Sequence, residues 1–277
     1  MFWHGQTILK LTERFGFAEG LKIYVTRMWA GLTRAQQYSI SLREYKQPLY
    51  LRTRSTDWDV FMHVIAEEEY RIRSVTHASA VRNFCDRITS RGEQPLIIDC
   101  GANTGFSARW FAKEYPESKI VAIEPEDGNY GMLLRNTHDI ANIVPRKAAV
   151  LDRPGFIAIA PSGGGEWAFQ VVSSDKGDIE AVTIAQIESE HADCRPFLVK
   201  IDIEGSEYGL FKSGAEWADD VPVIVLEPHD SLDPWQGTTD VVLHVLMRRP
   251  RDYLVQGEYI YVLTKKSLLD DASPPGA

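Results

Sequence analysis

The chain has 277 residues, a formal net charge of −9 and an ordinary globular composition, so it can bury a full hydrophobic core. The acidic balance disfavours a phosphate-backbone partner, and we expect no nucleic acid to bind. No segment approaches the roughly 18 uninterrupted apolar residues that a membrane span needs, and the three scattered cysteines lack metal-ligand spacing. We therefore expect a cytoplasmic protein with reduced thiols and no membrane span.

The first 69 residues are predicted to form an extension that packs on the main domain. Residues 1–30 carry apolar side chains at imperfect helical spacing and are interpreted as helical. Residues 38–45 and 48–54 have the composition of two short strands. A helix is expected to follow Thr56, which is a suitable N-cap residue.

From Pro95 onward, apolar runs of strand length alternate with helical patterns. This alternation indicates an α/β fold with a parallel sheet and right-handed crossovers. Residues 251–266 are predicted to form an antiparallel hairpin. We expect one domain over residues 70–268 and a flexible tail at 269–277. The predicted strands are 95–100, 119–125, 143–150, 156–161, 197–205 and 221–230, and the predicted helices are 104–115, 126–139, 206–214 and 239–249.

A glycine loop follows the strand predicted at 95–100. Asp99 lies at the carboxyl end of that strand, where ligands of open parallel sheets bind. Gly101 is expected to let the backbone approach a ligand closely, and Gly105 to bring the next helix near the strand. Because a carboxylate repels phosphate, Asp99 favours a ligand with an ammonium or sulfonium group over a dinucleotide.

The next predicted strand ends at Glu124, 23 residues after Gly101. An acid at this spacing can accept hydrogen bonds from both ribose hydroxyls of an adenosine. The two acids and the glycines together predict a site for S-adenosylmethionine. For either acid alone, a structural role stays open, with Asp99 capping a helix or Glu124 facing water.

The chain resembles the FkbM family of S-adenosylmethionine-dependent methyltransferases in five segments: IDCGANTGFSARWFA, AIEPEDGNYGMLLRN, AAV at residues 148–150, VKIDIEGSEYGLFKSG and VIVLEPHD. Upstream, LRTRSTDWDVFMHVIAEEEY is similar to the family's lead-in segment. The likeness spans roughly residues 51–230. It implies a Rossmann-like class I sheet of seven mostly parallel strands with a C-terminal antiparallel hairpin. It also implies methyl transfer, usually to a hydroxyl of a small molecule such as a sugar or secondary metabolite. The cofactor-binding residues predicted on this basis are Asp99, Gly101, Ala102, Asn103, Gly105, Glu124, Asn129, Ala149 and Asp202.

Two segments depart from the family pattern. Residues 1–45 fall outside the resemblance and are candidates for the acceptor pocket or for a homodimer contact. Residues 161–178 are rich in glycine and are predicted to form a mobile loop.

Asp202, Glu227 and His229 are the predicted catalytic residues. They lie at the carboxyl ends of two neighbouring predicted strands, so they should converge near the transferred methyl group. His229 is the preferred general base because imidazole titrates near neutral pH, and a loop histidine bonded to backbone is the alternative. We assign no metal, although the same three side chains could bind a divalent ion that orients a diol.

Two other classes of function stay open at this stage. A nicotinamide-dependent oxidoreductase is disfavoured by Asp99 and by the glycine spacing, which is not that of a dinucleotide site. A non-catalytic binding module on the same fold would keep its cofactor affinity after His229 and Asp202 are replaced.

Overall fold

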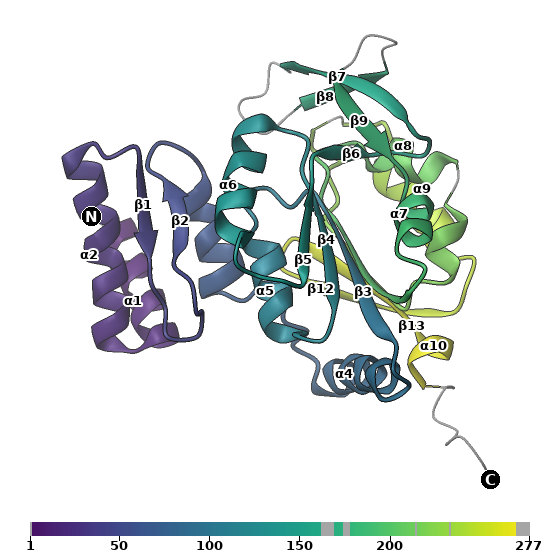
Figure 1. Cartoon of the computed structure of the whole chain (residues 1–277), viewed down its shortest axis with the longest axis horizontal. Coiled ribbons are helices and arrows are strands. Elements are labelled where there is room, and N and C mark those ends of the chain that lie inside the picture. Colours follow the sequence, from purple (N-terminus) through teal and green to yellow (C-terminus); the bar gives the residue numbers. More distant parts are fainter. Residues whose placement is uncertain (1, 162–168, 174–177, 214, 233, 270–277) are drawn as a thin grey trace.

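The computed structural model describes residues 2–161, 169–173, 178–213, 215–232 and 234–269 (Figure 1). A seven-stranded sheet forms its centre, in the order β12-β13-β11-β10-β3-β4-β5. The strands are β3 (Gln94–Cys100), β4 (Lys119–Ile123), β5 (Ile143–Arg146), β10 (Cys194–Ile201), β11 (Val223–Leu226), β12 (Arg251–Gln256) and β13 (Tyr259–Thr264).

The central strands are mostly buried and apolar, which is typical of parallel strands covered on both faces. β13 is the one strand of this sheet that runs opposite to the other six, since it pairs antiparallel with both β11 and β12. The predicted seven-stranded, mostly parallel sheet with a C-terminal hairpin is therefore confirmed. Chain order reverses between β3 and β10, which pair in parallel, so a crevice is expected where these two strands end.

Helices cover both faces of this sheet (Figure 1). One face packs on α4 (Val75–Ser90), α5 (Phe106–Glu114) and α6 (Asp127–Thr137) in one hydrophobic cluster. The other face packs on α7 (Ile184–Glu190), α8 (Glu207–Lys212), the 3-10 helix η2 (Glu216–Asp219) and α9 (Thr238–Leu246). Helix α10 (Lys265–Leu269) follows the last strand, and the rest of the predicted tail lies outside the described residues. Helix α4 was not predicted.

The N-terminal extension contains helices α1 (Phe2–Phe15) and α2 (Phe17–Thr33), the antiparallel pair β1 (Gln37–Ile40) and β2 (Leu49–Arg52), helix α3 (Asp57–Val60) and the π-helix η1 (Phe61–Ala66). The predicted helices and strands are confirmed, although β1 ends at Ile40 and not at Tyr45. Buried Leu11, Ile23 and Leu49 belong to the same hydrophobic cluster as α5. The extension therefore packs on the main sheet's α5 side, and its boundary at residue 69 stays a prediction.

A second, four-stranded sheet has the order β6-β9-β7-β8. Its strands are β6 (Ala148–Val150), β7 (Gly155–Pro161), β8 (Phe169–Ser173) and β9 (Ile179–Val182). The single strand predicted at 143–150 is wrong, because β5 pairs with β4 and β6 pairs with β9. The loop predicted at 161–178 contains β8, while residues 162–168 and 174–177 lie outside the described residues. Over the described part of the chain, no helix has the length and apolar character that crossing a membrane requires.

Candidate functional site

The glycine loop, residues 101–105, connects β3 to α5 and lies against the ends of both neighbouring strands. The amides of Gly101 and Ala102 donate to the carbonyl of Ile123 in β4, at 3.0 and 2.8 Å. Gly101 has φ +80°, and a Cβ there would lie 1.8 Å from the carbonyl oxygen of Asp202. Gly101 therefore permits a close approach to the chain's own backbone after β10, and the close approach to a ligand expected from the sequence stays a prediction.

Gly105 precedes α5 with φ +87°. A Cβ at this position would lie 2.8 Å from Cδ1 of Leu133. Leu133 belongs to α6, so Gly105 brings the start of α5 close to α6, whereas the sequence predicted close packing on a strand.

The Asp99 carboxylate is fully buried below the loop. Its Oδ2 accepts a hydrogen bond from Ser107 Oγ at 2.6 Å, and its Oδ1 lies 3.5 Å from Lys200 Nζ. The cation beside Asp99 in this structure is therefore an ammonium of the protein itself. A direct contact between Asp99 and a ligand stays a prediction.

Lys200 is a buried residue of the site that sequence reasoning did not select. Its Nζ donates to the carbonyl of Gly101 at 2.6 Å and lies 3.0 Å from Oδ2 of Asp202. Burial would lower the pKa of Lys200, but the charges around it, Asp202 first, raise that pKa well above its usual value. Lys200 therefore stays cationic and ties the glycine loop to the end of β10. A lysine inside the apolar run FLVKI was the signal that could have revealed it.

Glu124 lies directly after β4 and is 6% exposed. Its two oxygens accept one backbone hydrogen bond each, from Asn103 and Glu126, both at 2.9 Å. Asn103 adopts φ +48°, which turns its amide toward this carboxylate. Burial raises the pKa of Glu124 to about 7, although these two hydrogen bonds oppose the rise.

The other predicted cofactor residues are placed as follows. Asn129 lies in the first turn of α6, and its Oδ1 accepts a hydrogen bond from Arg52 of the extension at 2.7 Å. Ala102 is buried within the glycine loop, and Ala149 is buried in the second sheet beside Ile157. Contact between these residues and a cofactor stays a prediction.

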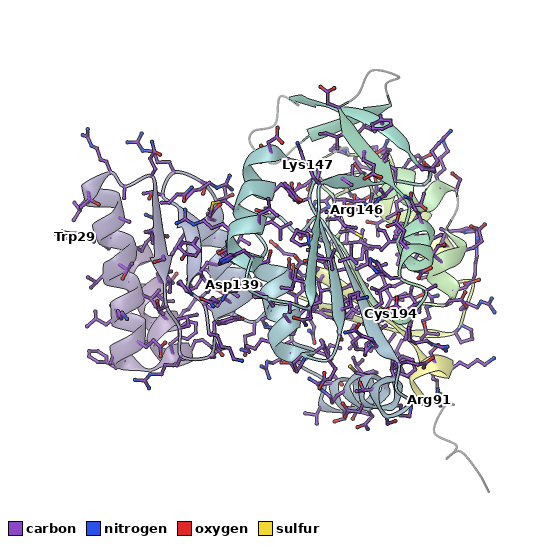
Figure 2. The ribbon with its side chains drawn as sticks, in the orientation of Figure 1. Trp29, Arg91, Asp139, Arg146, Lys147 and Cys194 are labelled. Carbon is purple, nitrogen blue, oxygen red and sulfur yellow. The ribbon has the colours of Figure 1, made fainter. Side chains whose placement is uncertain are left out.

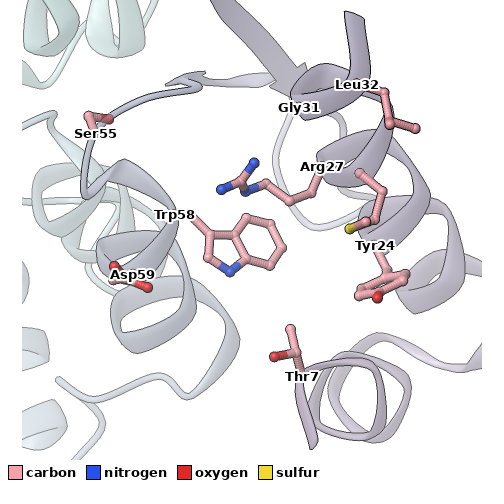
Figure 3. Close-up of a pocket in the computed structure, with 9 residues that line it drawn as sticks. Thr7, Tyr24, Arg27, Gly31, Leu32, Ser55, Trp58 and Asp59 are labelled. Atoms are coloured by element: carbon pink, nitrogen blue, oxygen red, sulfur yellow. The ribbon is translucent and has the colours of Figure 1, made fainter. Parts of the chain in front are cut away.

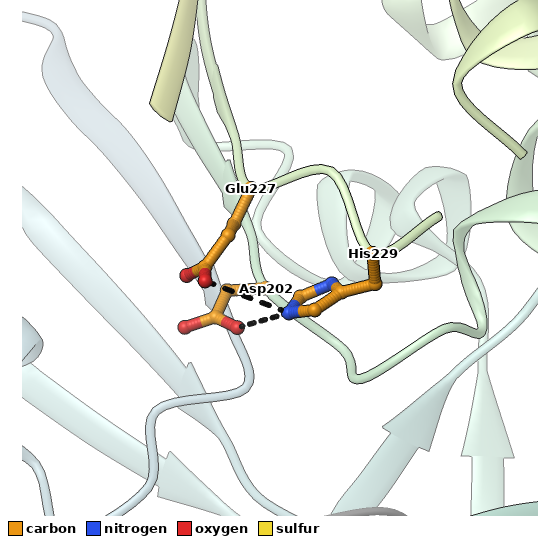
Figure 4. A group of neighbouring side chains, drawn as sticks. All are labelled: Asp202, Glu227 and His229. Atoms are coloured by element: carbon orange, nitrogen blue, oxygen red, sulfur yellow. Dashed lines mark ion pairs between the residues drawn. The ribbon is translucent and has the colours of Figure 1, made fainter. Parts of the chain in front are cut away.

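The three predicted catalytic residues converge at the ends of β10 and β11 (Figure 4). Nε2 of His229 lies 3.7 Å from Oδ1 of Asp202 and 3.7 Å from Oε1 of Glu227. The sequence-based expectation that these side chains meet is confirmed. On its other side, Nδ1 of His229 lies 2.8 Å from Oε1 of the buried Glu207, which orients the ring and directs Nε2 toward the two acids.

The electrostatics of this cluster favour a positive charge. Burial would lower the pKa of His229, but the hydrogen bond and charge of Glu207, with the charges of Asp202 and Glu227, raise it to about 9. Glu69, which the sequence analysis missed, faces the same charges. Burial and repulsion from Asp202 and Glu227 raise the pKa of Glu69 to about 8.

One further acid, Glu204, completes the cluster. Glu204 has Oε2 at 3.9 Å from Nε2 of His229. Burial, followed by repulsion from Asp202, raises the pKa values of Glu204 and Glu227 to about 7. A cationic ligand would relieve this repulsion and lower those pKa values.

Asp202, Glu227 and His229 also place one possible ligand atom each within 4.8 Å of the others. Such a set suits a divalent cation, with Glu207 as the group that orients the imidazole. Acidic clusters of this kind are common without an ion, and we assign no metal to this one.

Comparison with known proteins gives two sequence matches. The sequence profile of the Methyltransferase FkbM domain matches residues 99–254. The chain is also 38% identical over 54 residues to the methyltransferase sdnD of Sordaria araneosa. That stretch is 20% of this chain and 21% of the relative, so the match spans about a fifth of the relative's length.

Two solved structures illustrate the likeness to known methyltransferases. The O-methyltransferase from Bacillus cereus in complex with SAH is 11% identical, with a TM-score of 0.38, over 76% of this chain and 92% of that chain. An rRNA methylase from Streptococcus thermophilus is 11% identical, with a TM-score of 0.39, over 70% of this chain and 98% of that chain. These scores are too low to transfer a substrate from either protein.

Proposed function

Because the chain belongs to the Methyltransferase FkbM domain family, we propose that it transfers a methyl group from S-adenosylmethionine to a hydroxyl oxygen of a small molecule, such as a sugar or secondary metabolite. The observation that carries the proposal is the convergence of Asp202, Glu227 and His229 at the ends of β10 and β11 (Figure 4). This edge of an open α/β sheet is where ligands bind. The proposed methyltransferase domain is 70–268, with residues 1–69 as an extension packed on it.

The groups at the strand ends fit S-adenosylmethionine. Each Glu124 oxygen already accepts one backbone donor and has capacity for a further hydrogen bond, which suits the two ribose hydroxyls of an adenosine. Asp202 and the acids around it suit the positive charges of the methionine part. When bound, this cofactor supplies a methyl carbon activated by a positively charged sulfur.

The chain's own residues then hold the acceptor, exclude water and remove a proton. His229 is the proposed general base because Glu207 occupies Nδ1 and leaves Nε2 directed at the site. Neutral Nε2 would take the hydroxyl proton while the acceptor oxygen gains the methyl group, and the methyl–sulfur bond of the cofactor would break to leave S-adenosylhomocysteine. Glu207, Asp202 and Glu227 stabilise the imidazolium that results.

The proposal is tested by supplying the purified protein with S-adenosylmethionine and a panel of sugars, alcohols, phenols, amines and RNA. The measurement is the S-adenosylhomocysteine formed with each acceptor. Product with a hydroxyl compound supports the proposal. Product with amines or RNA alone would refute hydroxyl transfer, and no calorimetric binding of S-adenosylhomocysteine at millimolar concentration would refute the cofactor.

Replacement of His229 by asparagine is expected to lower kcat about 100-fold on the acceptor found in this way, the lower end of the usual contribution of a general base. In the wild type, kcat should rise with pH, reach half of its maximum near pH 9 and level off above that, because only neutral imidazole accepts a proton and the pKa of His229 is raised to about 9. This rise should be absent in His229→Asn.

His244→Asn is the matched control, since His244 is exposed on α9, and its kcat should equal that of the wild type. Added EDTA should leave wild-type kcat unchanged. Equal turnover in His229→Asn and the wild type would exclude His229 as the base, and loss of turnover in EDTA would point to a metal.

Cofactor affinity is expected to rise with pH through the neutral range. The folded-state pKa of Glu124 is raised to about 7 by burial, with Lys200 and Glu126 as its charged neighbours. Below pH 7 the carboxyl is protonated and loses acceptor capacity for ribose hydroxyls, so S-adenosylhomocysteine should bind roughly tenfold more weakly at pH 6 than at pH 8. Calorimetry on the wild type and on Glu124→Gln measures this. Glu124→Gln should bind weakly at both pH values, and an equal pH dependence in the variant would assign the titration to another group.

A further inference from the structure

Helix α2 has an apolar face turned away from the rest of the protein. The opposite face of α2 packs against the protein: Ile23 and Ala30 are buried, and a Cβ at Gly20 would lie 2.7 Å from the backbone of Leu11 in α1. Trp29 lies at the outer edge of the molecule (Figure 2). The exposed apolar side chains are Phe17 at 75%, Leu21 at 37%, Val25 at 54%, Met28 at 40%, Trp29 at 65% and Leu32 at 75%.

These side chains form one surface, which we call the α2 face. Phe17, Leu21, Val25, Met28 and Leu32 follow one another at intervals of three or four residues, so they lie along one side of the helix. At the exposures above, the face presents roughly 700 Å² of apolar area, more than the largest apolar patch of a typical monomer. Such a surface on a soluble domain indicates an interaction site.

The charge of the α2 face favours an apolar protein surface over a lipid surface. Lys22 is the one charged residue among the exposed positions of this helix. Helices that lie on membranes are usually rich in lysine and arginine, and the chain's net charge of −9 opposes anionic lipid. A partner for this face must therefore present mainly apolar side chains.

The face is complementary to itself when two copies of α2 run antiparallel. The order of its residues is nearly symmetric about Val25, so that Phe17 of one copy lies opposite Leu32 of the other, and Leu21 lies opposite Met28. A two-fold interface needs this property, because the same patch occurs on both subunits.

A cavity beside the face has room for one or two side chains of such a helix. It has a volume of about 340 Å³ and lies between α2 and α3 (Figure 3). Met28, Gly31 and Leu32 line it on one side, and Trp58 lines it on the other. Met28 and Leu32 belong to both the cavity and the α2 face. In the antiparallel arrangement, Phe17 of the second copy lies opposite Leu32, which lines this cavity.

We propose that the α2 face binds the α2 face of a second copy of this chain, in a two-fold antiparallel dimer centred near Val25. The roughly 700 Å² per copy is close to the roughly 800 Å² that each partner contributes to a standard stable interface. The proposal does not depend on the proposed methyl transfer, because the extension that carries α2 lies on the α5 side of the sheet.

Sedimentation velocity of the full chain over the micromolar range tests the oligomeric state. The wild type should sediment at twice its 31.3 kDa mass, and Val25→Glu and Leu32→Glu should sediment as monomers. Val255→Glu is the matched control: Val255 is 76% exposed on edge strand β12, against 75% for Leu32, and this variant should stay dimeric. A wild-type monomer at all concentrations, or a dimer that both α2 variants retain, would overturn the proposal.

Cross-linking tests the register of the two helices. The three native cysteines are buried, so Val25→Cys introduces one reactive thiol at the proposed two-fold axis. Mild oxidation should convert most of Val25→Cys to a disulfide-linked dimer and leave Val255→Cys monomeric. Equal cross-linking of both would overturn the antiparallel register. If the wild type is instead a monomer that binds anionic vesicles, and Val25→Glu abolishes that binding, the α2 face binds lipid and the proposed dimer is wrong.

Discussion

Gly101→Ala is expected to reduce S-adenosylhomocysteine affinity roughly 100-fold or more, which is a loss of about 2.7 kcal/mol or more in binding free energy. An alanine at φ +80° is strained by about 1–2 kcal/mol, and its Cβ would lie 1.8 Å from the Asp202 carbonyl oxygen. The loop must then move away from β10. This movement separates Lys200 from the Gly101 carbonyl and pulls the Asn103 amide from Glu124.

Gly131→Ala is the control for this prediction. Gly131 lies within α6, and nothing is within 4 Å of a Cβ built there. Alanine is a better helix former than glycine, so this variant should bind normally and gain up to about 1 kcal/mol in stability. Calorimetry and thermal unfolding measure both variants. Wild-type affinity and melting temperature in Gly101→Ala would show that the loop tolerates a side chain and that this contact does not shape the site.

The central sheet could be predicted because its signals are local. Buried parallel strands are short apolar runs, and β3, β4 and β11 each have an acid within one residue of their carboxyl end. The meeting of Asp202 with Glu227 and His229 follows from the same pattern, since neighbouring parallel strands end at one edge. Helix α4 also has a local signal, because Val81, Phe84, Cys85 and Ile88 share one face, and it could have been predicted.

The second sheet and the partner of Asp99 could not be predicted in this way. The strand with which a short strand such as β6 pairs is determined by long-range packing. The local sequence therefore does not indicate that β5 and β6 are separated at Lys147. Asp99 and Lys200 lie 101 positions apart, and only the pairing of β3 with β10 brings them together. The raised pKa of His229 depends in the same way on Glu207. The sequence places Glu207 at the start of the helix predicted at 206–214 and does not indicate that it contacts His229.

Lys200→Met is expected to destabilise the fold by about 3–5 kcal/mol, because it removes one partner from a buried ion pair and leaves the other charge uncompensated. Lys200 is 1% exposed and Asp99 is 0% exposed. Methionine has similar length and no charge, so packing loss contributes little. The loss of the Nζ contacts to Gly101 and Asp202 should also loosen the glycine loop. Chemical denaturation measures the change in the free energy of unfolding.

Two further variants separate the buried charge from other effects of this substitution. Lys113→Met removes a lysine that pairs with Glu44 nearer the surface, where both side chains are about a quarter exposed, and should cost at most about 1 kcal/mol. Asp99→Asn combined with Lys200→Met also removes the Asp99 carboxylate charge that Lys200→Met leaves unpaired. The double variant should therefore be more stable than Lys200→Met alone. If the two substitutions are instead additive and both destabilising, Lys200 stabilises the fold through Asp202 and the loop carbonyl, and the pair with Asp99 contributes nothing.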